Sequence, residues 1–333
     1  MFDGKTVLIT GGTGSLGTAL TIRLLKMGVK QIRIFSRNEF KQVEMENKFN
    51  DDRLRFLLGD IRDFPRLLRA TEDVNILFHA AALKHVTKVE YNPFEAIKTN
   101  VYGSQNVIDA CIQNKIERAV CIGSDKGVSP LNTYGATKLL MEKLFITAKR
   151  YSNPEKHPTK FFAVRYGNVS GSSGSVIPKF IEQIKNKQKI SITDKHMTRF
   201  SITMDEALDF VLESTKLGHG SEIFIPKLKA YDIMELKDTI VELLDDPGFE
   251  LIGIRQGEKL HEILINNDEI KNAWEYNNLY IIIDDQYKQE SLHDFFPGIK
   301  KIQNLDKYSS DVVQKLSKDE LKKIITESKL ISK

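Results

Sequence analysis

The sequence has only two cysteines, Cys111 and Cys121, among its 333 residues. Two cysteines cannot supply a disulfide framework or a zinc site, and free cysteines of this kind are usually small buried apolar side chains. The net charge of +4 is small for the length, so the composition does not indicate nucleic-acid binding. No metal site and no nucleic-acid partner are expected.

Long hydrophobic runs, repeats and linkers are also missing. The first apolar run covers only residues 6–10, which is too short for a signal peptide or a membrane span. With 41% hydrophobic and 28% charged residues, the chain has the composition of an ordinary globular protein. We therefore expect a cytoplasmic protein without membrane contact, whose lysine-rich stretch 318–333 forms a solvated helix.

Short β-rich segments alternate with amphipathic helical segments through the first half of the chain. The predicted strands cover residues 6–10, 31–35, 54–58, 76–79, 119–122 and 161–164. The predicted helices cover about 15–27, 39–49, 63–70, 93–113 and 133–150. This alternation predicts an α/β fold, a Rossmann-type doubly wound parallel sheet.

After residue 164 the rhythm becomes irregular, with loop-rich stretches and short elements. We predict a Rossmann domain over residues 1–170. Residues 171–333 are predicted to form a smaller C-terminal α/β substrate lobe and a helical tail, with some segments returning to the sheet. No linker is long enough to separate two independent domains.

A glycine-rich loop joins the first strand to the first helix. Its amides can face a pyrophosphate at the helix N-terminus, and three spaced glycines allow the tight turn, the close approach and the helix packing. The residues expected to bind the cofactor here are Gly11, Thr13, Gly14, Ser15, Leu16 and Gly17. A purely structural turn is the alternative.

The end of the second strand indicates which dinucleotide binds. An NAD site usually carries an acid there, but this chain has Ser36 and Arg37, which suit a 2′-phosphate. We predict NADP, against the alternative that Arg37 is a solvated loop residue. We expect Asp60 and Ile61 to lie near the adenine; the alternative is that Asp60 caps a helix. Ala80 and Ala81 leave room for the cofactor.

Two acid/base pairs lie within fifteen residues. Tyr134 and Lys138 are four residues apart and share one helix face, so we expect Lys138 to lower the pKa of the Tyr134 phenol. Asp125 and Lys126 add a second pair, which oxidation at one carbon does not need. The pattern predicts an enzyme whose chemistry goes beyond hydride transfer.

At this point the chain resembles a known family. The motifs are Thr10–Gly17, His79–Val86, Ser124-Asp125-Lys126, Tyr134/Lys138, Arg165–Asn168, Ile192–Asp194, Met197–Phe200 and Gly257–Glu262. They resemble inverting UDP-N-acetylglucosamine 4,6-dehydratases, which are extended short-chain dehydrogenases/reductases of pseudaminic acid and related polysaccharide biosynthesis. The resemblance implies tightly bound NADP, UDP-N-acetylglucosamine as substrate, and a homo-oligomer, either a dimer or a hexamer.

The resemblance also implies a role for each candidate residue. Tyr134, assisted by Lys138, would take the carbon-4 hydroxyl proton, with Ser124 orienting that oxygen. Lys126, if its pKa is depressed, would remove the carbon-5 proton while Asp125 protonates the departing carbon-6 hydroxyl. The candidates for substrate binding are Lys84, His85, Asn168, Arg199, Arg255 and Glu258.

Two other functions remain open. A nucleotide-sugar 4-epimerase needs the glycine loop and the Tyr134/Lys138 pair but has no use for Asp125 and Lys126. A non-catalytic NADP-binding regulator would keep the fold without turnover. The second acid/base pair favours the dehydratase.

Overall fold

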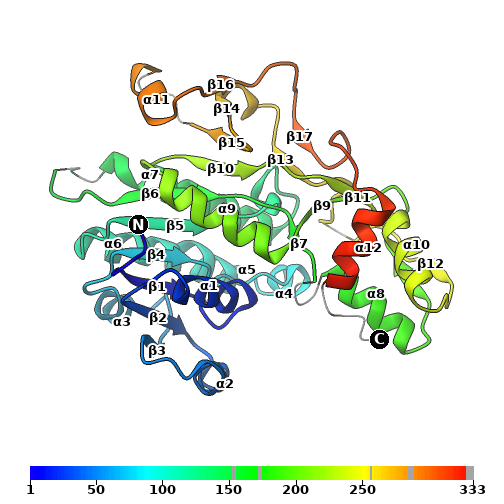
Figure 1. Ribbon diagram of the computed structural model, residues 1–333, viewed down its shortest axis with the longest axis horizontal. Coiled ribbons are helices and arrows are strands. Elements are labelled where there is room, and N and C mark those ends of the chain that lie inside the picture. The colour runs from blue at the N-terminus through cyan, green and yellow to red at the C-terminus, as the bar shows by residue number, and fades with distance from the viewer. Residues whose placement is uncertain (152, 154, 172–174, 256, 284–288, 328–333) are drawn as a thin grey trace.

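The computed structural model describes residues 1–151, 153, 155–171, 175–255, 257–283 and 289–327. Its largest element is a ten-stranded sheet in the order β16-β14-β15-β10-β6-β5-β4-β1-β2-β3 (Figure 1). Six of these strands come from the first half of the chain and pair in parallel. They are β1 (Thr6–Thr10), β2 (Gln31–Ser36), β3 (Leu54–Leu58), β4 (Ile76–His79), β5 (Arg118–Ile122) and β6 (Lys160–Val164). The predicted doubly wound α/β fold is confirmed.

Helices cover both faces of this sheet. One hydrophobic core joins the sheet to α1 (Ser15–Leu25), α2 (Glu39–Phe49) and α9 (Met204–Leu217). A second core, on the other face, joins it to α3 (Phe64–Ala70), α6 (Gly103–Gln113) and α7 (Thr133–Tyr151). Cys111 and Cys121 are buried in that second core, as expected.

The single helix predicted over residues 93–113 is wrong in detail. The segment consists of α5 (Pro93–Ala96), a π-helix η1 (Ile97–Tyr102) and α6, and a further helix α4 (Val86–Tyr91) precedes it. The π turn turns Thr99 and Asn100 inward, and Asn100 hydrogen-bonds both backbone groups of Leu83 and the hydroxyl of Thr137. Hydrophobic spacing alone does not reveal such a local change of winding.

The remaining strands of the large sheet come from beyond residue 171. β10 (Ile223–Pro226) pairs in parallel with β6. β15 (Leu279–Ile282), β14 (Ala273–Tyr276) and β16 (Lys300–Lys301) then continue the sheet in antiparallel fashion, and α11 (Gln289–Phe295) lies beside them (Figure 1). The boundary at residue 170 stays a prediction.

A second group of elements forms the lobe on the right of Figure 1. Its own core packs α8 (Val176–Lys185) and α10 (Ile233–Leu243) with α12 (Lys318–Glu327). Three small sheets pair β7 (Asn168–Val169), β9 (Thr198–Ile202) and β11 (Ala230–Asp232); β8 (Ile190–Ile192) and β12 (Phe249–Leu251); and β13 (Ile263–Ile265) and β17 (Tyr308–Ser309). Two 3-10 turns, η2 (Asp125–Gly127) and η3 (Ile270–Asn272), complete the described elements.

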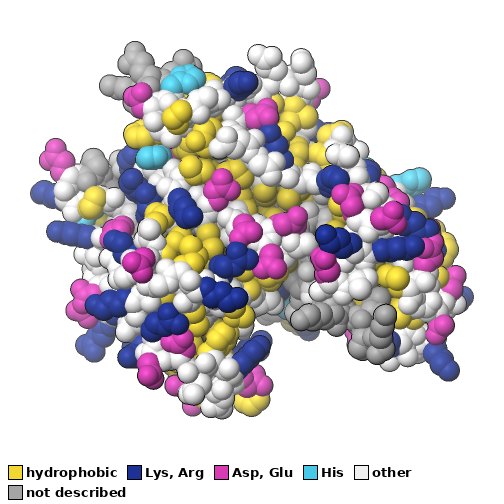
Figure 2. Space-filling model, in the orientation of Figure 1, with side chains coloured by type: hydrophobic (Ala, Val, Ile, Leu, Met, Phe, Trp, Pro, Cys, Tyr) yellow, Lys and Arg dark blue, Asp and Glu magenta, His cyan; other side chains and the backbone are white. Residues whose placement is uncertain are grey.

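The charged C-terminal stretch differs from expectation. α12 buries Leu321 and Ile325 against the lobe, so it is more than a solvated face, and residues 328–333 lie outside the described part. Basic and acidic side chains intersperse over the face seen in Figure 2. Within the described ranges no helix is both long and apolar enough to cross a membrane.

Candidate active site

A large cavity lies where β1, β2, β4, β5 and β6 end. It has a volume of about 730 Å³. All the residues predicted to bind the cofactor line it: Gly11, Thr13, Gly14, Ser15, Leu16, Gly17, Ser36, Arg37, Asp60, Ile61, Ala80, Ala81, Tyr134 and Lys138. The structure therefore brings the predicted set together in one cavity.

The glycine loop has the close backbone approaches that a dinucleotide cradle needs. Gly11 has a φ of +68°, and a Cβ there would lie 2.9 Å from the backbone of Ala81. A Cβ at Gly17 would lie 2.4 Å from the carbonyl oxygen of Gly12. Gly14 caps α1 without a side-chain hydrogen bond, so the first amides of the helix remain available to an anion.

Arg37 lies on the rim of this cavity. Its side chain is 52% exposed, and its guanidinium is 3.7 Å from Asp60. Asp60 also accepts hydrogen bonds from Arg62, which lower the pKa of Asp60 below its usual value although burial raises it. Asp63, not Asp60, caps α3, so the alternative that Asp60 is the helix cap is wrong.

The turn after β5 carries Ser124, Asp125 and Lys126. The Ser124 hydroxyl donates to Asp125 Oδ1 at 2.7 Å, and Lys126 Nζ donates to the same oxygen at 3.1 Å. Lys126 also donates to Asn168 Oδ1 at 2.9 Å. Ser124 and Lys126 line the cavity, whereas Asp125 is only 1% exposed.

The expected role of Lys138 in lowering the pKa of Tyr134 is wrong in this structure. The Lys138 ammonium donates to the carbonyl oxygen of Ile122 at 2.6 Å, and burial lowers its own pKa. Burial raises the pKa of Tyr134, while the charge of Lys126 and a hydrogen bond with Ser124 oppose that rise. The pKa of the phenol is therefore raised on balance, and the cation that opposes the rise is Lys126.

The expected depression of the Lys126 pKa is also wrong. Burial lowers the pKa of this ammonium, but the negative charges of Asp125 and Glu262 raise it by a larger amount, so the net shift is upward. Two carboxylates outweigh the desolvation that the sequence suggested. Lys126 is therefore charged at neutral pH.

A second cavity of about 320 Å³ opens toward the lobe. Arg199, Arg255 and Glu258 line it, as predicted for substrate contacts. Three residues, Lys126, Asn168 and Ser175, line both cavities and mark their junction.

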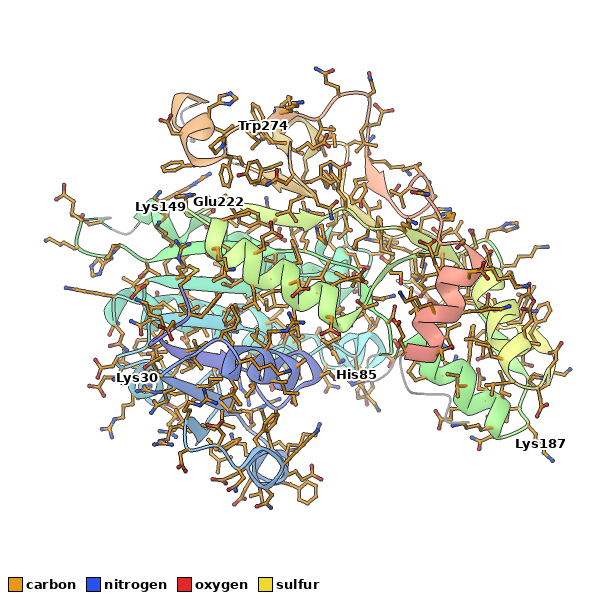
Figure 3. All side chains as sticks on the ribbon, viewed as in Figure 1. Lys30, His85, Lys149, Lys187, Glu222 and Trp274 are labelled. Atoms are coloured by element: carbon orange, nitrogen blue, oxygen red, sulfur yellow. The ribbon has the colours of Figure 1, made fainter. Side chains whose placement is uncertain are left out.

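Lys84 and His85 line the first cavity, not the second, and both are exposed. His85 lies between the sheet and the lobe in the view of Figure 3. The structure thus places these two substrate candidates on the cofactor side of the junction.

A family model described as polysaccharide biosynthesis protein matches residues 7–284. The chain belongs to that family. The inverting UDP-N-acetylglucosamine 4,6-dehydratase of Campylobacter jejuni strain 81-176 is 43% identical over 318 residues, which is 93% of this chain and 94% of the relative. A UDP-glucose 4-epimerase of Rickettsia conorii is 40% identical over 98% of this chain and 96% of its own.

A solved relative has the same overall architecture. The X-ray structure of Pen from Bacillus thuringiensis superposes with a TM-score of 0.91 at 39% identity, covering 99% of this chain and all of that one. The sheet and the lobe described above are therefore those of an experimentally determined relative.

Several residues of this polysaccharide biosynthesis protein family member reach the site without having been predicted. Glu262 lines the second cavity 3.6 Å from Lys126, and the Lys259 ammonium donates to the carbonyl of Val128. Tyr166 and Ser175 line the first cavity. Glu262 is the last residue of the Gly257–Glu262 motif, so its position in that motif and its carboxylate could have identified it as a site residue.

Proposed function

We propose that the protein is a UDP-N-acetylglucosamine 4,6-dehydratase that inverts carbon 5. The observation that carries the proposal is the Asp125–Lys126 ion pair beside the junction of the two cavities, with Tyr134 next to it. The C. jejuni relative named for this reaction supports it. The expected product is UDP-2-acetamido-2,6-dideoxy-β-L-arabino-hex-4-ulose.

We assign the larger cavity to NADP, because the glycine cradle leaves room for a pyrophosphate and Arg37 suits a 2′-phosphate. When bound, the nicotinamide would supply the hydride acceptor for carbon 4 and the hydride donor for carbon 6. Ser36, whose hydroxyl accepts from Gln42 at 3.0 Å, is held beside Arg37. The preference for NADP over NAD rests on these side chains.

Tyr134 acts at carbon 4. Its side chain is 7% exposed and close to Lys126 and Ser124, and its phenolate form would take the proton of the carbon-4 hydroxyl as that carbon is oxidised. The resulting ketone acidifies the proton on carbon 5. A positive charge at Lys126 favours the phenolate form of Tyr134.

Lys126 and Asp125 act on carbons 5 and 6. Because Lys126 is an ammonium beside a carboxylate, one proton passing from Nζ to Asp125 Oδ1 across 3.1 Å produces both forms that the elimination needs. The neutral amine then takes the carbon-5 proton, and the proton on Asp125 passes to the departing carbon-6 hydroxyl, which leaves as water. The original ion pair is restored. When hydride reaches carbon 6, carbon 5 takes up a proton on the opposite face, and release of the proton that Tyr134 took from the carbon-4 hydroxyl balances this addition.

Arg199 and Arg255 are assigned to the diphosphate, because guanidinium groups bind phosphate oxygens in a fork. Glu258 and Asn168 are assigned to hydroxyl groups of the substrate, and Lys84 and His85 to its reacting end. The cavity carries further cations, Lys179 and Lys259, which suit a dianion. We also propose that the protein is a cytoplasmic homo-oligomer. Light scattering would measure the mass of the assembly.

Nucleotide-sugar 4-epimerase is the second candidate, because relatives in Rickettsia named UDP-glucose 4-epimerase are 40% identical over nearly the whole chain. The reaction in D₂O separates the candidates. With UDP-N-acetylglucosamine, loss of water and deuterium at carbon 5 supports the dehydratase. A galacto-configured product without deuterium supports the epimerase, and retained cofactor without turnover supports a regulator.

A variant of Lys126 tests whether this residue is the general base of the elimination. Lys126→Ala should leave oxidation at carbon 4 detectable, although slower because Tyr134 loses a nearby cation, and should lose dehydration by about 10²–10⁴-fold, the usual effect of removing a general base. Lys30→Ala is the matched control, because Lys30 is exposed and is not among the residues lining either cavity (Figure 3). Normal dehydration by Lys126→Ala would contradict the assignment.

A further inference from the structure

The Glu262 carboxylate is held rigidly in the wall of the second cavity. Glu262 immediately precedes β13 and is 4% exposed. Its backbone N–H donates to the Ser310 hydroxyl at 2.9 Å, and its carbonyl accepts from the Ser310 N–H at 2.8 Å. Because the backbone is fixed on both sides, the lobe determines where this side chain lies.

This carboxylate lies between two cations that come from different parts of the fold. Its Oε1 is 3.6 Å from Lys126 Nζ, on the turn after β5, and 3.7 Å from Arg199 Nε, on β9 of the lobe. Its Oε2 is buried without a hydrogen-bond partner in the described ranges. A buried carboxylate costs several kcal/mol unless neighbouring charges compensate it. Lys126 and Arg199 are the cations placed to do so.

Lys126 is therefore held from two directions. On its own turn after β5 its ammonium donates to Asp125, and from the lobe it meets Asn168 on β7 and faces Glu262. Lysine carries its charge on a flexible four-carbon stem, so a base at this position needs partners that fix the nitrogen. Asp125 directly precedes Lys126 in the chain, so by itself it restrains Lys126 Nζ from one side only.

We propose that Glu262 is a positioning residue for the elimination step, holding Lys126 Nζ at the junction of the two cavities. The proposal rests on the proposed dehydratase function. It makes the lobe part of the acid/base machinery, because the residue that positions the base comes from the lobe.

The first test compares Glu262→Gln with wild type in single-turnover reactions in D₂O. Glutamine keeps the size and removes the charge. We expect reduction of the bound nicotinamide to stay within about twofold, while deuterium incorporation at carbon 5 and water loss fall about 10–100-fold, as a misplaced base predicts. KM should change little. An equal fall in both steps, or an unchanged rate of water loss, would overturn the proposal.

Glu258→Gln is the matched control. Glu258 lines the same cavity and lies 3.6 Å from Arg199, but Lys126 pairs with Glu262 and Asp125 instead. We expect this variant to raise KM and to leave the ratio of water loss to oxidation unchanged. The same change of ratio in both variants would show a general effect of charge loss and refute a specific role for Glu262.

The pH profile gives a readout that a merely structural role does not move. The groups that act on Lys126 are Asp125, Glu262 and Tyr134, and Lys126 in turn acts on Lys259. Removing one of the two carboxylates lowers the pKa of Lys126. The apparent pKa on kcat that belongs to Lys126 should therefore move down in Glu262→Gln, and an unmoved profile would contradict the proposal.

A double variant separates this proposal from the proposed function. In Lys126→Ala, Glu262 has no base to position, so adding Glu262→Gln should cause no further loss of deuterium incorporation. An additive loss would overturn the positioning role. If wild type itself releases no water from UDP-N-acetylglucosamine, the proposed function fails, which is a different outcome.

Discussion

Arg165 offers a stability test, because its guanidinium uses all of its hydrogen-bond donors inside the protein. The side chain is fully buried and donates twice to Glu142 at 2.6 Å, twice to Glu269 at 2.7 and 2.9 Å, and once to the carbonyl of Leu264 at 3.0 Å. Glu142 lies on α7, one turn beyond Lys138, and Glu269 lies in the segment after β13. One residue thus joins the sheet, the catalytic helix and the later segment.

We expect Arg165→Met to lower the free energy of unfolding by about 5 kcal/mol. Breaking a buried pair costs about 3–5 kcal/mol, because the remaining charge has no counter-ion. Glu142 is 3% exposed at its side chain and bears most of this cost, while Glu269, at 15%, bears less. The unpaired Leu264 carbonyl adds about 1–3 kcal/mol. The loss is comparable to the whole stability of many domains, about 5–15 kcal/mol.

The assay is urea denaturation followed by tryptophan fluorescence and by circular dichroism. Adding Glu142→Gln and Glu269→Gln to Arg165→Met should recover part of the loss, because the uncompensated charges disappear. A cost below about 1 kcal/mol for Arg165→Met, a typical value for an exposed pair, would refute the reasoning.

The same network predicts a pH effect. Burial raises the pKa of Glu269, but the hydrogen bonds from Arg165 and its positive charge lower that pKa by a larger amount. The pKa in the folded protein therefore lies below the ordinary 4.5. Its stabilising contribution is therefore present above that value and is lost as pH falls through the folded pKa. Arg165→Met should flatten this acid limb, and an unchanged limb would contradict the assignment.

Three further predictions concern the nucleotide end. Burial and the charge of Lys138 lower the pKa of His79 to about 3, so as pH falls the unfolded chain binds a proton at this residue before the folded protein does. The free energy of unfolding should therefore fall by about 1.4 kcal/mol per pH unit below about pH 6. His79→Gln should flatten that slope in urea titrations. Gly17→Ala should weaken NADP binding, measured by calorimetry, because its Cβ would meet the Gly12 carbonyl; unchanged affinity would contradict the cradle. Arg37→Ala should weaken NADP about 10–100-fold and NAD little, as loss of charged hydrogen bonds predicts; equal losses would refute the 2′-phosphate assignment.

The first half of the fold could be predicted because its strands are short, apolar and buried on both faces. The six predicted strands end within one residue of those observed, and each of the nucleotide-end candidates lines one cavity. Parallel pairing brings strand ends to one edge, so positions along the sequence translate directly into positions in space.

The charges at the catalytic centre could not be predicted in the same way. Spacing correctly placed Lys138 on the helix face of Tyr134, but the side chain reaches the Ile122 carbonyl. The pKa of Lys126 is raised by Asp125, its neighbour in sequence, and also by Glu262, which is distant in sequence and arrives through the lobe. A pKa depends on contacts of this kind, which local sequence does not contain.

The return of the chain to the sheet has a consequence for how the protein is made. β6 is complete at Val164, but its parallel neighbour β10 begins only at Ile223, and β15 and β14 follow after residue 272. During synthesis, the backbone edge of β6 stays unpaired until about sixty more residues have emerged, and unpaired edges invite pairing with other chains. We expect fragments ending near residue 170 to aggregate, although they contain the whole nucleotide loop.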